Sequence, residues 1–309
     1  MTQPGYFETR SFDSAREFFE HLRPSSDHWG KGLDCDWLFR GHGDASWELL
    51  PRALRTPCEE LAPLHLRCGS DHVDSLLLGV RSVDPQIREL RSTFVGKFMK
   101  ALSIALRSFS SLANELGHQM GDASDLWSPR PRHNYVSADE PSIVMALAQH
   151  HGIPTILLDW TRQPLVAAFF ASDGEHDTDI AVWALCEGVC DPPSAFGGVR
   201  APIAVVASPR YFHRFEHAQH GVYTAMAGST VHNFFMREGR WPNIQDALDA
   251  GQVCVDKICL KKLVLKGTEI PGLKKLLWRE GISRAHLMPT LDSVSKTVIE
   301  LWRDLDFRP

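Results

Sequence analysis

Two short segments of the sequence carry most of the side chains that could bind or transform a ligand. The first reads Trp-Leu-Phe-Arg-Gly-His-Gly over residues 37–43 and places Arg40 directly after an apolar run. Packing explains an arginine there poorly, whereas its planar guanidinium suits paired hydrogen bonds to phosphate or carboxylate oxygens. A structural ion pair is the competing interpretation. Gly41 and Gly43, on either side of His42, allow the backbone to turn tightly or to approach a ligand.

The second segment, residues 149–171, gathers amide, imidazole, carboxylate, indole and hydroxyl groups around a short apolar run. It reads Gln-His-His-Gly-Ile-Pro-Thr-Ile-Leu-Leu-Asp-Trp-Thr-Arg-Gln-Pro-Leu-Val-Ala-Ala-Phe-Phe-Ala. A buried polar group without a partner costs about 1–3 kcal/mol, so this density predicts either a stiff internal network or a pocket. Asp159 and Thr161 also suit the N-cap of the helix expected after them, and that structural role competes with ligand contact.

Other common kinds of site have weaker support. His213 and His217 are spaced to share one helix face, but no H-E-x-x-H pattern accompanies them, so we predict no metal. The seven cysteines are scattered without a C-x-x-C pair, which predicts reduced thiols rather than disulfides or a Cys–His nucleophile. No glycine-rich phosphate loop follows an expected strand, which argues against a Rossmann-type fold.

Composition limits the class of protein. The chain has 309 residues and a formal net charge of −5, which argues against binding through broad phosphate neutralisation. Hydrophobic residues make up 43% of the chain, enough for a globular core. No apolar window is long enough to span a membrane and no signal-peptide pattern is present, so we expect a cytoplasmic protein. A nucleic-acid surface would rest either on the Trp-Ser-Pro-Arg-Pro-Arg-His loop at residues 127–133 or on a set of basic residues that are more simply a solvated helix face, namely Arg52, Arg55, Arg81, Arg88, Arg91 and Lys97.

Apolar periodicity predicts the elements that position these residues. Expected helices cover residues 11–23 (with Ser11 as N-cap), 85–116, 164–171, 271–279 and 292–305. Another is expected to end at His150, with Ser137 or Asp139 as N-cap and Pro141 in its first turn. Expected strands cover residues 35–39, 155–161, 180–185, 203–207, 221–226 and 254–265, with another near His286. Irregular segments are expected at 56–83, 117–139 and 239–251. Because helices and strands mix without regular β-α-β alternation, we predict an α+β fold.

Several of these stretches resemble the FRG domain, a bacterial family named for its Phe-Arg-Gly triplet. Residues 39–41 carry the triplet, with Pro51 downstream, and residues 149–161 follow the family pattern Q-H-x-G-x-P-T-R-L-L-D-W-T. Two later family elements, A-Q-x-G-x-F-T and F-P-D-L-D, are similar to residues 218–224 and 287–292. In place of the usual arginine, asparagine and phenylalanine, the chain has Ile156, Gln163 and Tyr223.

The resemblance covers about residues 37–295 and implies a single FRG domain over residues 1–309, with a helical N-terminal segment and a helical insert at 85–116. The order of the family's motifs is similar to that of ADP-ribosyltransferases of the Arg–Ser–Glu type. This similarity implies an ADP-ribosyltransferase-like mixed-sheet core with flanking helices, and NAD as the substrate. Cleavage of the nicotinamide–ribose bond passes through an oxocarbenium-like cation, which needs a carboxylate nearby and an arginine on the diphosphate.

The resemblance also implies site residues. Those expected to take part in catalysis are Arg40, Asp159, Thr161 and Gln219, and those expected to bind NAD are Arg40, Gly41, His150 and Trp160. Arg40 would clamp the diphosphate, and His150 or Thr161 would position a ribose. Trp160 would stack on nicotinamide or pack beneath it, and Gln219 would contact the ribose or the acceptor.

One position departs from the transferase pattern. Gly221 stands where that pattern has a glutamate, and the carboxylates that could replace it are Asp159, Glu216 and Glu269. Asp159 would otherwise order the motif. The departure favours the alternative interpretation, a non-catalytic nucleotide-binding sensor that controls a partner protein.

The leading functional hypothesis is an NAD-using ADP-ribosyltransferase or NAD glycohydrolase that acts as a bacterial toxin or phage-defence effector. Its expected partners are NAD or a related nucleotide, a protein or nucleic-acid acceptor, and an antitoxin or immunity protein. No membrane contact is expected.

Overall fold

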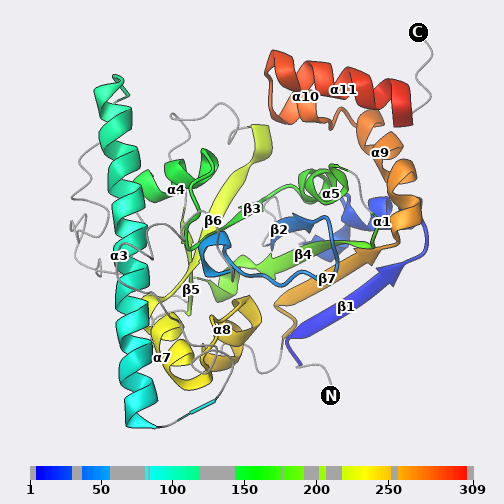
Figure 1. Cartoon of the computed structure of the whole chain (residues 1–309). Coiled ribbons are helices and arrows are strands. Elements are labelled where there is room, and N and C mark those ends of the chain that lie inside the picture. Colours follow the sequence, from blue (N-terminus) through cyan, green and yellow to red (C-terminus); the bar gives the residue numbers. More distant parts are fainter. Residues whose placement is uncertain are drawn as a thin grey trace.

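The computed structural model describes residues 5–29, 37–55, 81–82, 84–118, 143–174, 177–190, 202–206, 218–251 and 257–304. These residues form a seven-stranded mixed sheet with helices packed against it (Figure 1). The predicted α+β class is therefore confirmed. Within the described residues, no helix combines the length and the apolar character needed to cross a membrane.

The strands follow one another across the sheet in an order unrelated to their order in the chain. That order is β1 (Phe7–Phe12), β7 (Leu260–Leu265), β4 (Ile180–Cys186), β2 (Trp37–His42), β3 (Leu157–Thr161), β6 (Gly221–Met226) and β5 (Ile203–Val206). β1 and β7 are parallel, and the other neighbours are antiparallel. β2 pairs with β4 along its whole length, but its ladder with β3 consists of the pair Phe39–Thr161. The sheet is thus weakly joined between β2 and β3.

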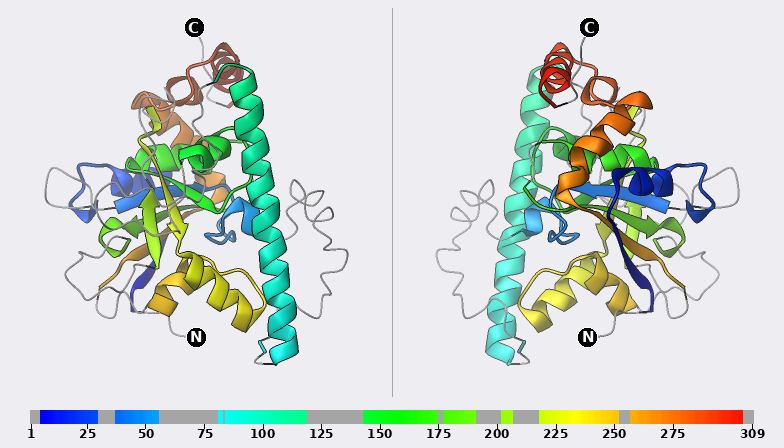
Figure 2. Two further views of the ribbon diagram at one scale, coloured as in Figure 1. Left: turned by 90° about the vertical axis from the view of Figure 1, so that its left-hand side faces the viewer. Right: turned by 90° about the vertical axis from the view of Figure 1, so that its right-hand side faces the viewer.

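Alternation along β2 divides the core between the two faces of the sheet, because successive side chains of a strand point to opposite faces. Phe39 is buried with α1 (Ala15–Leu22), α5 (Pro164–Ser172) and α9 (Ile270–Arg279). Leu38 is buried in the cluster formed with α3 (Pro85–Glu115), α7 (Gly228–Glu238) and α8 (Ile244–Gly251). Helix α3 runs the height of the molecule along one side (Figures 1 and 2).

The remaining helices complete the two ends. α4 (Ile143–His150) packs with α3 against β3 and β6. α10 (Arg284–Leu287) and α11 (Leu291–Asp304) follow α9 at the opposite end (Figure 1). Single 3-10 turns occur at Asp27–Trp29, Arg52–Leu54, Glu187–Val189 and Gly267–Glu269.

Several predicted boundaries are wrong. Ser11 lies in β1, and the helix begins at Ala15 with Ser14 as its N-cap, whose Oγ accepts from the amide of Arg16 at 3.2 Å. Arg40 lies inside β2 rather than after its end, because the ladder with β4 continues through the polar residues to His42.

Some elements were also assigned wrongly. Residues 239–251 contain helix α8, which begins with a reciprocal capping box. Asn243 Oδ1 accepts from the amide of Asp246, and Asp246 Oδ2 accepts from the amide of Asn243, each at 2.9 Å. The segment around His286 is the short helix α10, not a strand. The irregular segments predicted at 56–83 and 117–139 lie almost wholly outside the described residues.

Helix α3 confirms the longest prediction but corrects the environment of one arginine. Arg91, expected on a solvated face, is fully buried. Its Nη1 donates to the carbonyl of Met236 at 2.9 Å and to that of Arg237 at 3.2 Å, near the end of α7. Arg91 is therefore unavailable to a nucleic acid.

Candidate functional site

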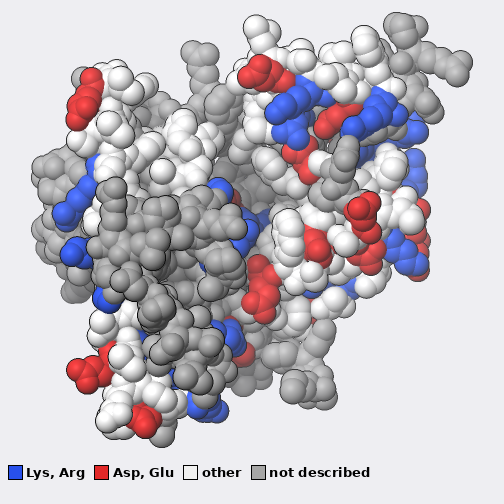
Figure 3. All heavy atoms as spheres, in the orientation of Figure 1, with Lys and Arg blue, Asp and Glu red and all other residues white. Residues whose placement is uncertain are grey.

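A cavity of about 360 Å³ lies beside the single residue pair, Phe39–Thr161, that joins β2 to β3. Its wall includes every site residue predicted from the sequence, namely Arg40, Gly41, His150, Asp159, Trp160, Thr161 and Gln219. The cavity thus draws on β2, β3, β6, α4 and α5, which are distant in the sequence. In the space-filling view a recess is seen near the middle of the face shown, with Lys or Arg atoms beside it (Figure 3). The structure brings the predicted residues together, and their roles stay predictions.

Arg40 is held at two of its three guanidinium nitrogens. Nη1 donates to the carbonyl of Asp159 at 2.7 Å, and Nε donates to Nε2 of His42 at 3.1 Å. The ion pair with Asp159 is looser, with Nη1 3.4 Å from Oδ2. The Arg40 side chain is 15% exposed and that of Asp159 58% exposed. Such an exposed pair contributes about 1 kcal/mol or less, so an ion pair alone does not explain the arginine.

Asp159 is oriented by the residues that precede it in the motif. Gln149 Nε2 donates to Asp159 Oδ1 at 2.9 Å and to the carbonyl of Leu157 at 3.3 Å. The hydroxyl of Thr155 in turn donates to Gln149 Oε1 and accepts from the amide of Leu157. The dense polar segment is therefore an ordered network that ends in one carboxylate at the cavity.

The other candidate carboxylates are elsewhere or outside the description. Asp159 is the one carboxylate in the cavity wall among the described residues. Glu269 Oε2 accepts from the amide of Ala15 at 2.8 Å, so Glu269 stabilises the start of α1. Glu216 lies outside the described residues, as do His213 and His217. Within the described part of the chain, no group of three or more His, Cys, Asp or Glu is placed to hold a metal ion.

Thr161 and Gln219 connect the cavity wall to its surroundings. The Thr161 hydroxyl donates to the carbonyl of Gln219 at 2.6 Å and accepts from the amide of Gln163 at 3.0 Å, immediately before α5. The predicted capping role is wrong for both Asp159 and Thr161, because the N-cap of α5 is Gln163 and no side chain caps the helix. Gln219 Nε2 donates to the carbonyl of Leu287 at 3.2 Å, which ties the wall to α10.

Trp160 borders the cavity but is almost wholly buried. Its side chain is 3% exposed and belongs to the core cluster on the α3 face. Its Nε1 donates to the buried hydroxyl of Thr224 on β6 at 2.8 Å. Its arrangement relative to a ligand stays a prediction.

A protein-family model matches the part of the chain that forms most of the cavity wall. Residues 35–180 match the model of the FRG domain. The chain contains an FRG domain. The match covers β2, β3, α4 and α5, and hence every predicted site residue except Gln219. No curated protein and no solved structure gives a significant match, so the ADP-ribosyltransferase-like core and the extent of a single domain over residues 1–309 stay predictions.

The glycine of the FRG triplet has a packing role in this structure. A Cβ on Gly41 would lie 2.1 Å from the carbonyl oxygen of Ala167 and 2.5 Å from the amide nitrogen of Ala171. β2 and α5 therefore touch backbone to backbone at this point, and only glycine allows the approach. The helix that follows the second FRG motif is positioned directly against the first.

Sequence reasoning missed four residues that support the FRG site: His42, Gln149, Thr155 and Thr224. Gln149 and Thr155 stand in the quoted motif, so the requirement that buried polar groups be paired could have identified them. His42 is two residues from Arg40 on a strand, which places both on one face. Thr224 lies far along the chain from Trp160, and only the β3–β6 register brings the two strands together.

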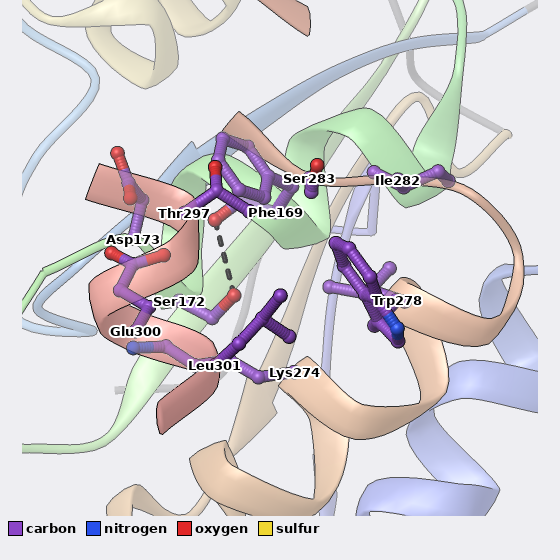
Figure 4. Close-up of a pocket in the computed structure, with 11 residues that line it drawn as sticks. Phe169, Ser172, Asp173, Lys274, Trp278, Ile282, Ser283, Thr297, Glu300 and Leu301 are labelled. Carbon is purple, nitrogen blue, oxygen red and sulfur yellow. Dashed lines mark hydrogen bonds between the residues drawn. The ribbon is translucent and has the colours of Figure 1, made fainter. Parts of the chain in front are cut away.

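A second, smaller cavity lies between α5, α9 and α11 and differs in character (Figure 4). Its volume is about 40 Å³, too small for a nucleotide, and Phe169, Trp278 and Leu301 contribute to its wall. The hydroxyl of Ser172 donates to the carbonyl of Phe169 at 3.1 Å rather than to a ligand (Figure 4). None of the predicted site residues borders it.

Replacing Thr224 by valine should lower the free energy of unfolding by about 1–3 kcal/mol, because the buried Nε1–H of Trp160 loses its acceptor. Urea denaturation measures the change. The double variant Trp160→Phe/Thr224→Val removes both partners and serves as the control, since it leaves no unpaired donor. The single variant Trp160→Phe completes the comparison. If the double variant loses as much stability as Thr224→Val and Trp160→Phe added together, the hydrogen bond contributes nothing.

Proposed function

We propose that this FRG-domain protein binds NAD in the cavity and cleaves its nicotinamide–ribose bond, as an ADP-ribosyltransferase or an NAD glycohydrolase. One observation carries the proposal: the cavity presents an arginine and an oriented carboxylate side by side. No hydrogen bond within the described residues engages Nη2 of Arg40, so this edge of the guanidinium can donate to a diphosphate.

The second charged group suits the bond that breaks. When the bond between nicotinamide and ribose C1′ breaks, nicotinamide leaves with the electron pair and positive charge develops on the ribose. A carboxylate held in place beforehand stabilises that charge without reorganising. Water or an acceptor then bonds to C1′ and loses a proton to the solvent. We assign the carboxylate role to Asp159, whose Oδ1 is held by Gln149, because Gly221 offers no side chain.

The remaining predicted residues would complete the substrate site. Trp160 forms the floor on which the nicotinamide end lies, and His150 contacts a ribose. Thr161 fixes the segment that carries Gln219, and Gln219 contacts the ribose or the acceptor. The arrangement in the cavity wall supports these assignments.

In the cell, we propose that the protein acts in the bacterial cytoplasm as a toxin or phage-defence effector, on a protein or nucleic-acid acceptor or on NAD itself. An antitoxin or immunity protein would then hold it inactive. Induced expression of wild type should arrest growth, and Arg40→Ala should not. Loss of cellular NAD in the arrested culture would indicate hydrolysis, and labelled macromolecules would indicate transfer.

A second candidate function follows from the lack of a glutamate at Gly221. The carboxylate of Asp159 is 3.4 Å from Arg40 Nη1 and is partly neutralised by it. If Asp159 therefore cannot stabilise the cation, the cavity binds a nucleotide without cleaving it. The FRG domain then acts as a sensor that controls a partner. A sensor is stabilised by its ligand and does not consume it.

Asp159→Asn separates the enzyme from the sensor. Asparagine keeps an oxygen for the hydrogen bond from Gln149 but carries no charge, so we expect NAD to bind within about threefold of wild type. Nicotinamide release should fall by about 100-fold or more, the usual effect of losing one electrostatic stabiliser. Calorimetry and chromatography measure the two quantities. Undiminished release by Asp159→Asn would exclude the carboxylate role.

A further inference from the structure

His42 lies against Arg40 on the face of β2 that also carries Leu38. Nothing in the proposed function uses it. The two residues are two positions apart on the strand, so their side chains share a face. His42 is 2% exposed. Its Nε2 is 3.1 Å from Nε of Arg40, which donates to it.

The surroundings keep this histidine neutral. Its burial, together with the positive charges of Arg40, Arg55 and Lys262, lowers the pKa of His42 to about 3. Asp44, an acidic group that interacts electrostatically with His42, is only half-buried. A neutral imidazole offers one nitrogen as an acceptor, whereas an imidazolium offers none. Nε2 can therefore accept from Arg40 at neutral pH.

Two anchors on a planar group determine its orientation. His42 holds Nε, and the carbonyl of Asp159 holds Nη1 at 2.7 Å. With these two nitrogens fixed, the guanidinium plane cannot rotate about the Cδ–Nε bond. The direction in which Nη2 points is therefore fixed as well. Removing either anchor restores that rotation, which a bound ligand would then have to stop.

We propose that His42 is a positioning residue that fixes the guanidinium plane of Arg40 for an anionic ligand of the diphosphate class. The inference rests on the proposed function, in which Arg40 binds the diphosphate of NAD. Immobilising a long side chain before binding spares about 0.5–1.5 kcal/mol, so loss of His42 should weaken diphosphate binding about 3- to 10-fold.

The test compares His42→Leu with His42→Gln. Leucine fills the space without an acceptor, whereas the Oε1 of glutamine can take the place of Nε2. The readout that needs no ligand is hydrogen exchange of the Arg40 Nε–H by 15N NMR, with the signal assigned through Arg40→Lys. We expect slow exchange in wild type and His42→Gln and fast exchange in His42→Leu. Thermal melting checks that each variant folds, and His42→Asn, whose shorter side chain does not reach Nε, replaces His42→Leu if leucine prevents folding.

The same variants are then titrated with NAD and with inorganic pyrophosphate. We expect affinity to fall 3- to 10-fold in His42→Leu and to recover in His42→Gln. Exchange that stays slow in His42→Leu, or an affinity loss that His42→Gln does not restore, would overturn the inference. If wild type binds neither probe while the exchange pattern follows the acceptor, the proposed function fails and the positioning of Arg40 stands.

Discussion

Arg40→Ala should strongly weaken NAD binding while leaving the protein folded. Truncating one partner of a desolvated, charge-assisted contact costs about 2–5 kcal/mol, or roughly 30- to 5,000-fold in Kd. The fold loses only a bond to the Asp159 carbonyl, a bond to His42 and a loose ion pair with an exposed carboxylate. The melting temperature should therefore stay within a few degrees of wild type. Calorimetric titration with NAD and a thermal melt measure the two effects.

Two control variants sharpen this result. Arg40→Lys keeps the charge but not the planar fork, so its affinity should lie between those of wild type and Arg40→Ala. Arg52→Ala removes the same kind of side chain from outside the cavity wall, where Arg52 Nη1 donates to the carbonyl of Gly152 at 3.4 Å. It should bind NAD as wild type does. If Arg40→Ala unfolds, the structural interpretation of the arginine is correct.

Gly41→Ala should destabilise the protein by about 3 kcal/mol or more, the upper end of the cost of overpacking a core. Its new methyl group would lie 2.1 Å from Ala167 O and 2.5 Å from Ala171 N. Both are backbone atoms, so no side-chain rotation relieves the contact, and β2 or α5 has to move. Urea denaturation measures the loss.

The control for Gly41→Ala is Gly96→Ala in α3. A Cβ on Gly96 meets no atom within 4 Å, and alanine is favoured over glycine in a helix interior by about 0.5–1 kcal/mol. This variant should be slightly more stable than wild type. Shortening Ala171 to glycine should not rescue Gly41→Ala, because the backbone nitrogen stays in place. A Gly41→Ala protein as stable as wild type would contradict the close approach of β2 and α5.

Elements with strong local signals could be predicted from the sequence. α5 follows a polar strand end and begins with Pro164, and α3 has a long apolar stripe, so both were placed closely. Arg40 was placed just after the end of its strand, because the sequence Arg-Gly-His-Gly at residues 40–43 is typical of a loop. The strand continues because its backbone pairs with β4, a partner that the local sequence does not reveal.

The membership of the candidate site was predictable, but its internal geometry was not. The motif residues around Asp159 were expected to form a network or a pocket, and they form a network that borders a pocket. The helix cap expected from Asp159 or Thr161 was wrong, because α5 begins later, with Gln163 as its N-cap and no side-chain cap. The support of Arg40 by His42 requires side-chain geometry, which spacing alone does not give.

The central claim is that the cavity cleaves NAD, and nicotinamide release by the purified protein tests it most directly. Wild type incubated with NAD should release nicotinamide in proportion to time and enzyme, with matching free or transferred ADP-ribose. Arg40→Ala and Asp159→Asn should release almost none, so a contaminating activity is excluded. NAD that binds wild type and stays intact would contradict cleavage and leave the sensor, and the absence of both binding and release would contradict the NAD site altogether.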